Sequence, residues 1–441
     1  MNARFPLFCI TLVASTSVAL AAGSVSAGSV SPSVEPASPG GTLAPPPMSL
    51  GAGQPLALSD ALDTARRGSF SIGSAQARIQ AAQARLRAAG AFPGPTLTLA
   101  RAFGSSHTAG FDEDILLSQV IELGKRGSRL QGARADAESA RFDREGVLND
   151  LDFAIRSTFF DALRTGIERD LATQALKTAQ TFQNAAQIQF TAGDVPRANV
   201  VRAGIELLRA QSALEAAQSD QSVRLAALRS LLALPDEAPL QLGEKLGFSP
   251  VTYDLAALQE LAAQKRADLQ SARAALRSRQ AGVQTARALR RPDGFVEARR
   301  AAITSYAGAP NGNSLRIGAV IPLFDFGRNR AGMSEARAGV LEQRATLDQA
   351  TRAARLDVAT TFERFVAAQK AVQSFNNGRL AQARELLDMA QTGYEHGANS
   401  YLELIDAQTV ERNEEADYAR ALAAWNTALA DLQRAVGGQL P

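Results

Sequence analysis

The fold is decided by residues 315–331, which read LRIGAVIPLFDFGRNRA. In the first part of this stretch, apolar residues alternate with Arg316 and Gly318, and that period of two is typical of a β-strand. Pro322 and Gly327 then interrupt the pattern, and no further proline occurs until the last residue of the sequence. The stretch therefore predicts a strand at 315–323 that turns directly into a long helix.

Two windows without proline have helical composition, at about residues 126–190 and 327–392. A helix of about 65 residues would be about 100 Å long at ~1.5 Å per residue, which exceeds the diameter of an ordinary domain. Such helices are stable only when they pack along partners, as in a coiled coil or a helical barrel. A second helix with apolar residues at heptad spacing is predicted after each, at 197–234 and 399–437.

The two halves of the sequence resemble each other. FTAG at 190–193 corresponds to YEHG at 394–397, and ELGK at 122–125 corresponds to DFGR at 325–328. This self-similarity predicts an internal duplication. The predicted parts are opening helices at 57–91 and 254–291, a first repeat at 56–234, a linker at 235–253 and a second repeat at 254–437.

The first residues have the features of a secretory signal. Residues 1–21 contain Arg4, a short apolar run and a small-x-small end, so we expect them to be removed on export. Residues 22–55 are rich in Ser, Gly, Ala and Pro and predict a flexible tether. The only cysteine, Cys9, lies within the signal and follows Phe8, so neither a disulfide nor a lipid anchor is expected.

A pair of strand-like segments precedes each long helix, at 96–103 and 114–123 in the first half and at 295–303 and 315–323 in the second. Alternating segments of ~9–11 residues joined by Gly-rich loops are typical of transmembrane β-strands. Four strands cannot close a barrel around a pore, and open edges are not tolerated in lipid. Either these strands form a soluble sheet, or several chains share one barrel. The signal peptide and the long helices favour the shared barrel.

Composition excludes several classes of function. The net charge is +3 and is spread without a basic block, so nothing supports binding of nucleic acid. No P-loop, dinucleotide fingerprint or nucleophile–base arrangement occurs, so we expect neither catalysis nor a cofactor. Only two histidines are present and the cysteine lies in the signal, so a tight zinc site is not expected.

The chain resembles the TolC family of outer-membrane factors over about residues 55–437. The resemblance rests on the duplication, on VIPLFDFGRNRA at 320–331, on YEHGANSYLELIDAQ at 394–408 and on GDVPRANVVRA at 193–203. It implies a homotrimer in the outer membrane, with a twelve-stranded β-barrel continued by an α-helical barrel in the periplasm. It also implies contact with outer-membrane lipid and two protein partners, a periplasmic membrane-fusion adaptor and an inner-membrane pump of the RND type.

Within this family, LSQVIELGKRGSR at 117–129 is similar to the corresponding phrase of the cobalt–zinc–cadmium efflux branch. That branch usually has two glycines before Lys-Arg, and this chain has one. The resemblance implies a passive exit duct for divalent heavy-metal cations. Alternatives are a general drug-efflux or type I secretion channel, and, from another class, a soluble periplasmic coiled-coil adaptor or scaffold.

The resemblance also assigns candidate site residues. Glu403 and Asp406 match positions that ring the periplasmic entrance, and Tyr394 matches a tyrosine that ties the closed entrance. Arg202, which corresponds to Asp406 in the first half, is a candidate counter-charge. The remaining candidates are Asn199 at the gate, Gly193 and Gly397 at the adaptor-facing tips, and Gly124, Lys125, Arg126, Pro322, Gly327 and Arg328 at the strand-to-helix junctions.

Cations in the first turn of a helix oppose its dipole. We therefore expect one of two environments for the cations in these first turns: a solvent-exposed surface, or contact with anionic lipid headgroups at the membrane boundary. These cations are Lys125, Arg126 and Arg129, with Arg328 and Arg330 in the second half. Asn399 stands where the best-known family member has an arginine that latches the entrance, so this latch is not expected here.

Overall fold

The computed structural model describes residues 55–102, 112–303, 312–396 and 398–440, and all of these belong to one compact unit. The fold is mostly helical and includes one four-stranded antiparallel sheet. This confirms the predicted mainly-α fold with four strands per chain. The predicted signal at 1–21 and the tether at 22–55 lie outside the described residues, except for Pro55.

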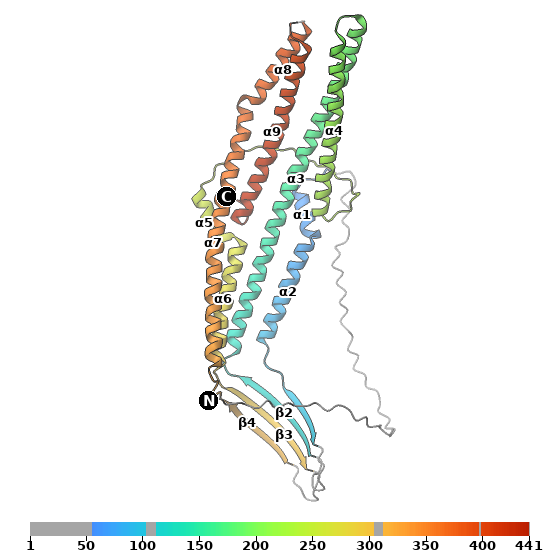
Figure 1. Cartoon of the computed structure of the whole chain (residues 1–441). Helices are drawn as coiled ribbons and strands as arrows, with labels where there is room; N and C mark the ends of the chain where they lie inside the picture. Colours follow the sequence, from blue (N-terminus) through green and yellow to red (C-terminus); the bar gives the residue numbers. More distant parts are fainter. Residues whose placement is uncertain (1–54, 103–111, 304–311, 397, 441) are drawn as a thin grey trace, which may run out of the picture. The chain divides into compact units, whose positions relative to one another are not determined.

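The same order of elements occurs twice (Figure 1). The first half contains α1 (Leu58–Gly68), α2 (Phe70–Gly90), β1 (Thr96–Ala102), β2 (Asp112–Glu122), α3 (Arg126–Ala192) and α4 (Arg197–Leu231). The second half contains α5 (Leu255–Lys265), α6 (Ala267–Ala288), β3 (Asp293–Ile303), β4 (Gly312–Val320), α7 (Arg328–Ser374), the π-helical turn η1 (Phe375–Arg379), α8 (Leu380–Glu395) and α9 (Tyr401–Val436).

Each predicted opening helix is broken once, because one residue has non-helical backbone angles. In the first half this residue is Ser69, whose side chain accepts a hydrogen bond from the Ile72 amide at 3.5 Å and so caps α2. In the second half it is Arg266, whose guanidinium donates to Asp357 at 2.7 Å and to the Ala435 carbonyl at 2.9 Å. The second break therefore joins α6 to the end of α9.

The two long helices differ. The helix α3 runs for 67 residues without interruption. The helix predicted at 327–392 is interrupted by η1, where Gly378 has a φ of 131° that a residue with a Cβ rarely adopts. Arg379 then stacks on Phe375 at 4.2 Å and donates to Glu414 of α9 at 2.8 Å. The prediction of one continuous helix is wrong here.

The strands lie in the order β1-β2-β3-β4, so the two halves meet where β2 pairs with β3. Directly opposed residues share a face, and the register separates two faces. The apolar face carries Leu97, Leu99, Ile115, Leu117, Ile121, Val296, Leu315 and Ile317. The other face is mainly polar and carries Thr96, Thr98, Asp114, Ser118, Glu122, Asp293, Glu297, Arg299, Ser314 and Arg316, together with the apolar Leu116, Val120, Phe295 and Val320.

Polar side chains pair across the polar face. Arg299 donates two hydrogen bonds to Asp114, at 2.8 and 2.9 Å, and Arg316 lies 3.7 Å from Glu297. The apolar face is open in the single chain, where Leu315 is 70% and Ile317 is 78% exposed. The sheet is therefore a surface with one lipophilic side and one hydrophilic side.

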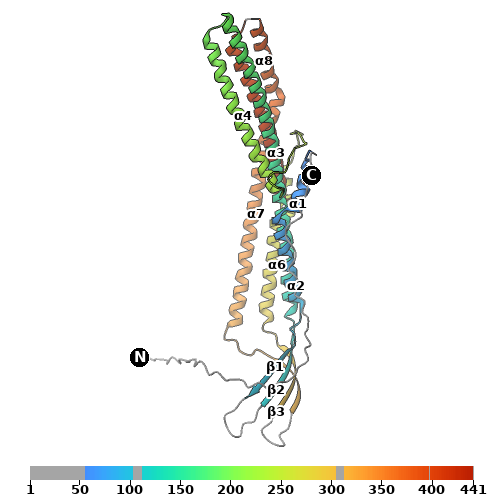
Figure 2. The ribbon, with the colours of Figure 1, turned by 90° about the vertical axis from the view of Figure 1, so that its right-hand side faces the viewer.

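The helices form two layers beyond the sheet (Figures 1 and 2). Next to the sheet, the neighbours are α2, α3, α6 and α7 in that order; farther away, α4 packs on α3, α3 on α9, and α9 on α8. Small apolar cores lie between the layers, around Phe159 in the first half and around Phe365 and Trp425 in the second. Of the predicted heptad seam of α9, Leu422, Trp425, Leu432 and Val436 are buried, and Tyr418 and Leu429 are half-buried.

Candidate gate and strand-to-helix junctions

The first junction turns at Gly124, whose φ is 79°. The Arg291 guanidinium donates to the Gly124 carbonyl at 3.1 Å, and a Cβ added at Gly124 would lie 2.1 Å from this guanidinium. Glycine is therefore favoured here by the backbone conformation, whereas the flexible Arg291 side chain could move to make room for a Cβ.

Three cations of this junction bind groups within the chain. Lys125 pairs with Asp293 at 2.5 Å, and Arg129 pairs with Glu122 at 2.8 Å. Arg126 donates to the Gly90 carbonyl at 2.6 Å and stacks on Phe92 at 4.6 Å. The charged groups of these three residues therefore have partners within the protein, and their contact with lipid headgroups stays a prediction.

These contacts explain the cations at the start of α3. Arg129 also donates to the carbonyls of Ala89 and Ala91, at 3.0 and 3.2 Å, so Arg126 and Arg129 together cover the C-terminal end of α2. Cations are unfavourable at a helix N-terminus and favourable at a C-terminus. The unfavourable interaction of these cations with the dipole of α3 is thus offset by their favourable interaction with the C-terminal end of α2. Sequence periodicity alone does not reveal this compensation.

The second junction is built differently. The strand β4 ends at Val320, three residues before its predicted end, because Pro322 has no N–H for a sheet hydrogen bond. Phe326 and Gly327 have φ values of 48° and 91°. The Asp325 carboxylate accepts hydrogen bonds from the Gly327 and Asn329 amides, at 3.1 and 2.9 Å, and these bonds lower its pKa. Arg328 and Arg330 are exposed.

The first tip is the turn between α3 and α4. Gly193 ends α3 with a φ of 90° and donates its N–H to the Phe190 carbonyl at 3.1 Å, while the Asp194 amide donates to the Gln189 carbonyl at 2.9 Å. This is a left-handed cap of the Schellman type, for which glycine is favoured. Its counterpart Gly397 lies outside the described residues.

Glu403 caps its own helix. Its carboxylate accepts from the Ser400 amide at 2.6 Å, and the Ser400 hydroxyl accepts from the Glu403 amide at 3.4 Å, which together form a capping box at the start of α9. The pattern Ser-x-x-Glu could have been recognised in the sequence. A substitution of Glu403 would therefore weaken α9 as well as remove a charge.

The other gate candidates are only partly brought together. Asn199 and Arg202 of α4 line a groove of about 350 Å³, and Tyr401 of α9 lines its opposite wall. Asp406 is exposed and is not part of this lining. Within the described residues, no ion pair joins Arg202 to Asp406 or to Glu403.

Aromatic contacts at the tips join the two halves, and sequence analysis missed them. Tyr401 contacts Phe182 of α3 with ring centroids 5.5 Å apart, and it contacts Tyr394 of α8 at 6.2 Å. Phe182 and Tyr394 also pack against the small buried cluster of Ala390, Leu404 and Ala407. Burial, with the neighbouring Tyr394 and Glu206, raises the pKa of Tyr401 to about 12.

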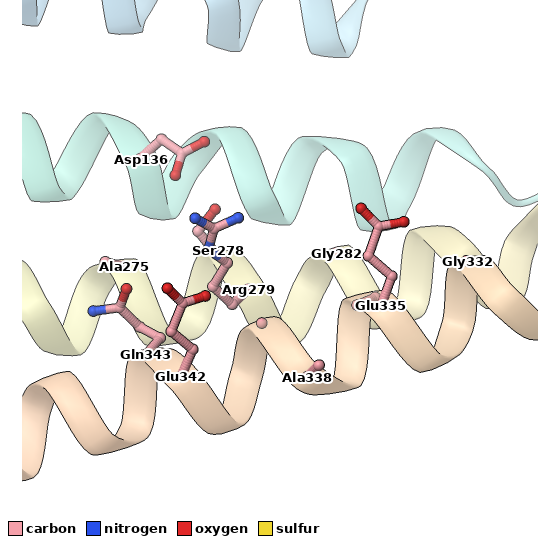
Figure 3. A pocket seen from close by; sticks show the side chains of 12 residues that line it. Asp136, Ala275, Ser278, Arg279, Gly282, Gly332, Glu335, Ala338, Glu342 and Gln343 are labelled. Atoms are coloured by element: carbon pink, nitrogen blue, oxygen red, sulfur yellow. The ribbon is translucent and has the colours of Figure 1, made fainter.

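A larger groove, of about 990 Å³, follows α6 and α7 in the layer next to the sheet (Figure 3). The groove is lined by Asp136 of α3, Arg279 of α6, and Glu335 and Glu342 of α7. Glycines, which have no side chain, form the rest of its wall together with small and polar residues. Within the described ranges, no group of three or more His, Cys, Asp or Glu is arranged to hold a metal ion. His107 lies outside these ranges, and the absence of a resident metal stays a prediction.

None of the helices in the described part of the chain is both long enough and apolar enough to cross a membrane.

Comparison with known proteins gives a consistent result. The model of the outer membrane efflux protein family matches residues 61–234 and 258–438. The cobalt-zinc-cadmium resistance protein CzcC of Cupriavidus metallidurans is 26% identical over 367 residues, which cover 80% of this chain and 83% of that protein. Protein CyaE of Bordetella pertussis is 27% identical over 372 residues, with 80% and 78% coverage.

Solved structures share the fold. The structure of CusC aligns with a TM-score of 0.73 at 18% identity and covers 87% of this chain and 92% of its own. The open state of the MtrE outer membrane channel of Neisseria gonorrhoeae aligns with a TM-score of 0.73 at 19% identity, with 86% and 89% coverage. At these identities the likeness concerns the fold alone.

Proposed function

Because the chain belongs to the outer membrane efflux protein family, and is therefore a passive outer-membrane efflux channel and not an enzyme, we propose that three copies assemble into one duct. In this proposal four strands from each chain close a twelve-stranded barrel in the outer membrane. The repeats at 56–234 and 254–437 each supply one hairpin to it, and the helices continue the duct into the periplasm.

One observation carries the assembly: every layer of the described fold has two open edges. They are β1 and β4 in the sheet, α2 and α7 in the near layer, and α4 and α8 in the far layer. An open sheet edge in lipid leaves backbone groups without hydrogen bonds, which costs several kcal/mol per group. Pairing β1 of one copy with β4 of the next removes these edges, and the helical edges meet in the same step.

The apolar face of the sheet then faces lipid and the polar face lines the duct. Members of this family work with an adaptor and an inner-membrane pump. In our proposal the exposed tips near Gly193 and Gly397 meet the periplasmic adaptor. The pump, of the RND type, supplies the energy that this chain has no chemistry to provide.

The periplasmic entrance is proposed to close at the tips. Asp406 and Glu403 from three copies would bring like charges together, and the Arg202 guanidinium, beside Asn199, would oppose them. Tyr394 adds a contact within the second half. The Phe182–Tyr401 contact at 5.5 Å supports this gate, because it ties the α3–α4 hairpin to the α8–α9 hairpin.

Divalent heavy-metal cations are the proposed cargo. Support comes from the similarity to a protein named for cobalt-zinc-cadmium resistance, at 26% identity. A drug-efflux or type I secretion channel is the second candidate, because an identity of 26% does not by itself carry the cargo over from the relative.

Two experiments test the proposal. The protein should leave the outer membrane only with detergent and should conduct as a trimer in planar bilayers; release by osmotic shock would support the soluble adaptor or scaffold instead. For the cargo, deletion of the gene should lower tolerance to cobalt, zinc and cadmium, and the intact gene should restore it. Loss of tolerance to hydrophobic drugs with unchanged tolerance to metals would contradict the cargo and leave the channel intact.

A further inference from the structure

Two arginines interrupt the apolar face of the sheet, and both lie near the end that is remote from the helices. Arg300 of β3 stands in the same row as Leu99, Ile115 and Asn313. Arg101 of β1 stands in the next row outward. Both side chains are exposed.

The depth of the two arginines in the membrane follows from the apolar residues that lie between them and the helices. From Leu315 to Leu323, β4 and the residues after it carry exposed apolar side chains toward the helices, including Ile317 at 78% and Leu323 at 79%. At ~3.4 Å per residue and a strand tilt of ~40°, the part of this stretch that lies in β4, from Leu315 to Val320, spans about 13 Å of membrane depth. The exposed Ile321 and Leu323 continue it beyond the strand, toward the ~25 Å apolar band of membrane barrels.

The helix-side end of this band is marked by phenylalanines. Phe92, Phe324 and Phe326 are 68%, 87% and 103% exposed. Charged side chains on a lipid-facing surface are costly at mid-depth and nearly neutral at the membrane boundary. Arg300 and Arg101 therefore mark the opposite, external boundary.

We propose that Arg300 and Arg101 form a phosphate-binding rim for lipid headgroups of the outer leaflet. A guanidinium presents two parallel N–H groups to two phosphate oxygens, and weak hydration favours its use at such a surface. Arg101 stands opposite Glu113 in the sheet register, so Arg300 is the principal residue of the rim. The occupant is a phosphorylated glycolipid, and this inference depends on the trimeric barrel proposed above.

The neighbouring residue provides the internal contrast. Arg299 precedes Arg300 directly but lies on the polar face, where it donates two hydrogen bonds to Asp114. Successive side chains of a strand point to opposite faces. Binding of lipid phosphate should therefore depend on Arg300 and not on Arg299.

The test uses the detergent-purified full-length protein titrated with bisphosphorylated lipid A, with dephosphorylated lipid A as the matched probe. Native mass spectrometry counts bound lipid, and thermal unfolding measures the shift that it produces. We expect R101Q/R300Q to lower the apparent affinity about tenfold, as loss of charge-assisted hydrogen bonds to phosphate implies, with R300Q alone accounting for most of it.

The control is R299Q, which should retain the lipid-dependent shift. If loss of the Asp114 pair prevents folding of this variant, R316Q serves instead, because its pair with Glu297 is longer, at 3.7 Å.

Three outcomes would overturn the rim. They are equal stabilisation of the wild type by both lipids, full retention of lipid affinity in R101Q/R300Q, and a loss of lipid affinity in the control variant as large as in R101Q/R300Q. Conductance of the wild type separates the two proposals. A protein that conducts as a trimer but shows no phosphate dependence contradicts the rim alone, whereas one that neither inserts nor conducts contradicts the barrel, and the rim with it.

Discussion

At the scale of single residues, Arg129 illustrates how one side chain can serve two elements. It belongs to the first turn of α3, yet its guanidinium binds Glu122 at the end of β2 and the carbonyls at the end of α2. The junction between sheet and helices therefore depends on a few charged hydrogen bonds, since the local cores lie farther along the helices.

Arg129→Gln tests this dependence. The change removes the ion pair and leaves the half-buried Glu122 carboxylate without its cation, so we expect a loss of about 1–3 kcal/mol in the free energy of unfolding. Thermal unfolding of the purified protein, followed by circular dichroism, measures it. Arg328→Gln, at an exposed position of the other junction, should stay within about 0.5 kcal/mol. Equal effects at both positions would contradict the assignment.

Asp325 gives a prediction for pH. Its pKa is lowered by the amides of Gly327 and Asn329, so its contribution to stability is complete above the unfolded value of about 3.9 and is lost as the pH falls through the lower folded value. The melting temperatures of Asp325→Ala and the wild type should therefore differ at neutral pH and converge only in strong acid. Convergence of the two melting temperatures already at mildly acidic pH would show that the hydrogen bonds from Gly327 and Asn329 do not act through the ionised carboxylate of Asp325.

At the scale of elements, the two hairpins at the tips are unequal. The first is built on the uninterrupted α3, whereas the second follows the π-helical turn at 375–379. The two are tied by Tyr401, which lies between Phe182 of one half and Tyr394 of the other. We expect this tyrosine to hold the hairpins together.

Tyr401→Ala should favour the open entrance. An aromatic pair contributes about 0.5–1.5 kcal/mol beyond its burial, so the ratio of open to closed channels should rise about two- to tenfold. Single-channel recording in planar bilayers measures this ratio. Tyr418→Ala is the matched control, because the Phe375–Tyr418 contact at 5.6 Å lies within the second half and does not join the hairpins. An unchanged ratio in Tyr401→Ala, or an equal rise in the control, would argue against the tie.

Asp406→Ala is the cleaner probe of the proposed ring of charges. Glu403 also caps α9, so its substitution would mix a loss of helix stability with a loss of charge. Asp406 is exposed and has no such role in the described part of the chain.

At the scale of the whole molecule, the single chain leaves large apolar side chains uncovered. Leu341 and Leu356 of α7 are 67% and 68% exposed on the helix that forms one edge of the near layer. A neighbouring copy at this edge, as proposed above, would cover both side chains.

Leu341→Arg together with Leu356→Arg should prevent trimer formation while leaving the helical content of the chain unchanged. Light scattering of the detergent-solubilised protein measures the mass, and far-ultraviolet circular dichroism measures the helices. Ile188→Arg is the control, because Ile188 is 68% exposed on α3, which has neighbours on both sides. A trimer that survives the double substitution would place the interface elsewhere.

Much of the fold could be predicted because its signals are local. The absence of proline over long windows, the alternation at 315–321 and the matching phrases of the two halves each depend on neighbouring residues. The errors arose where local and distant interactions compete. Ser69, Arg266 and Gly378 break helices that periodicity alone would continue.

The amino-acid sequence by itself determined the helices, the strands, their duplication and the family, since these follow from periodicity, turn residues and short motifs. Only the tertiary structure decided which groups meet: the cations at the start of α3 with the end of α2, Tyr401 with Phe182, and Arg299 and Arg300 on opposite faces of one sheet. The physical reason is that hydrogen bonds and ring contacts form between atoms close in space, and their partners here lie far apart along the chain.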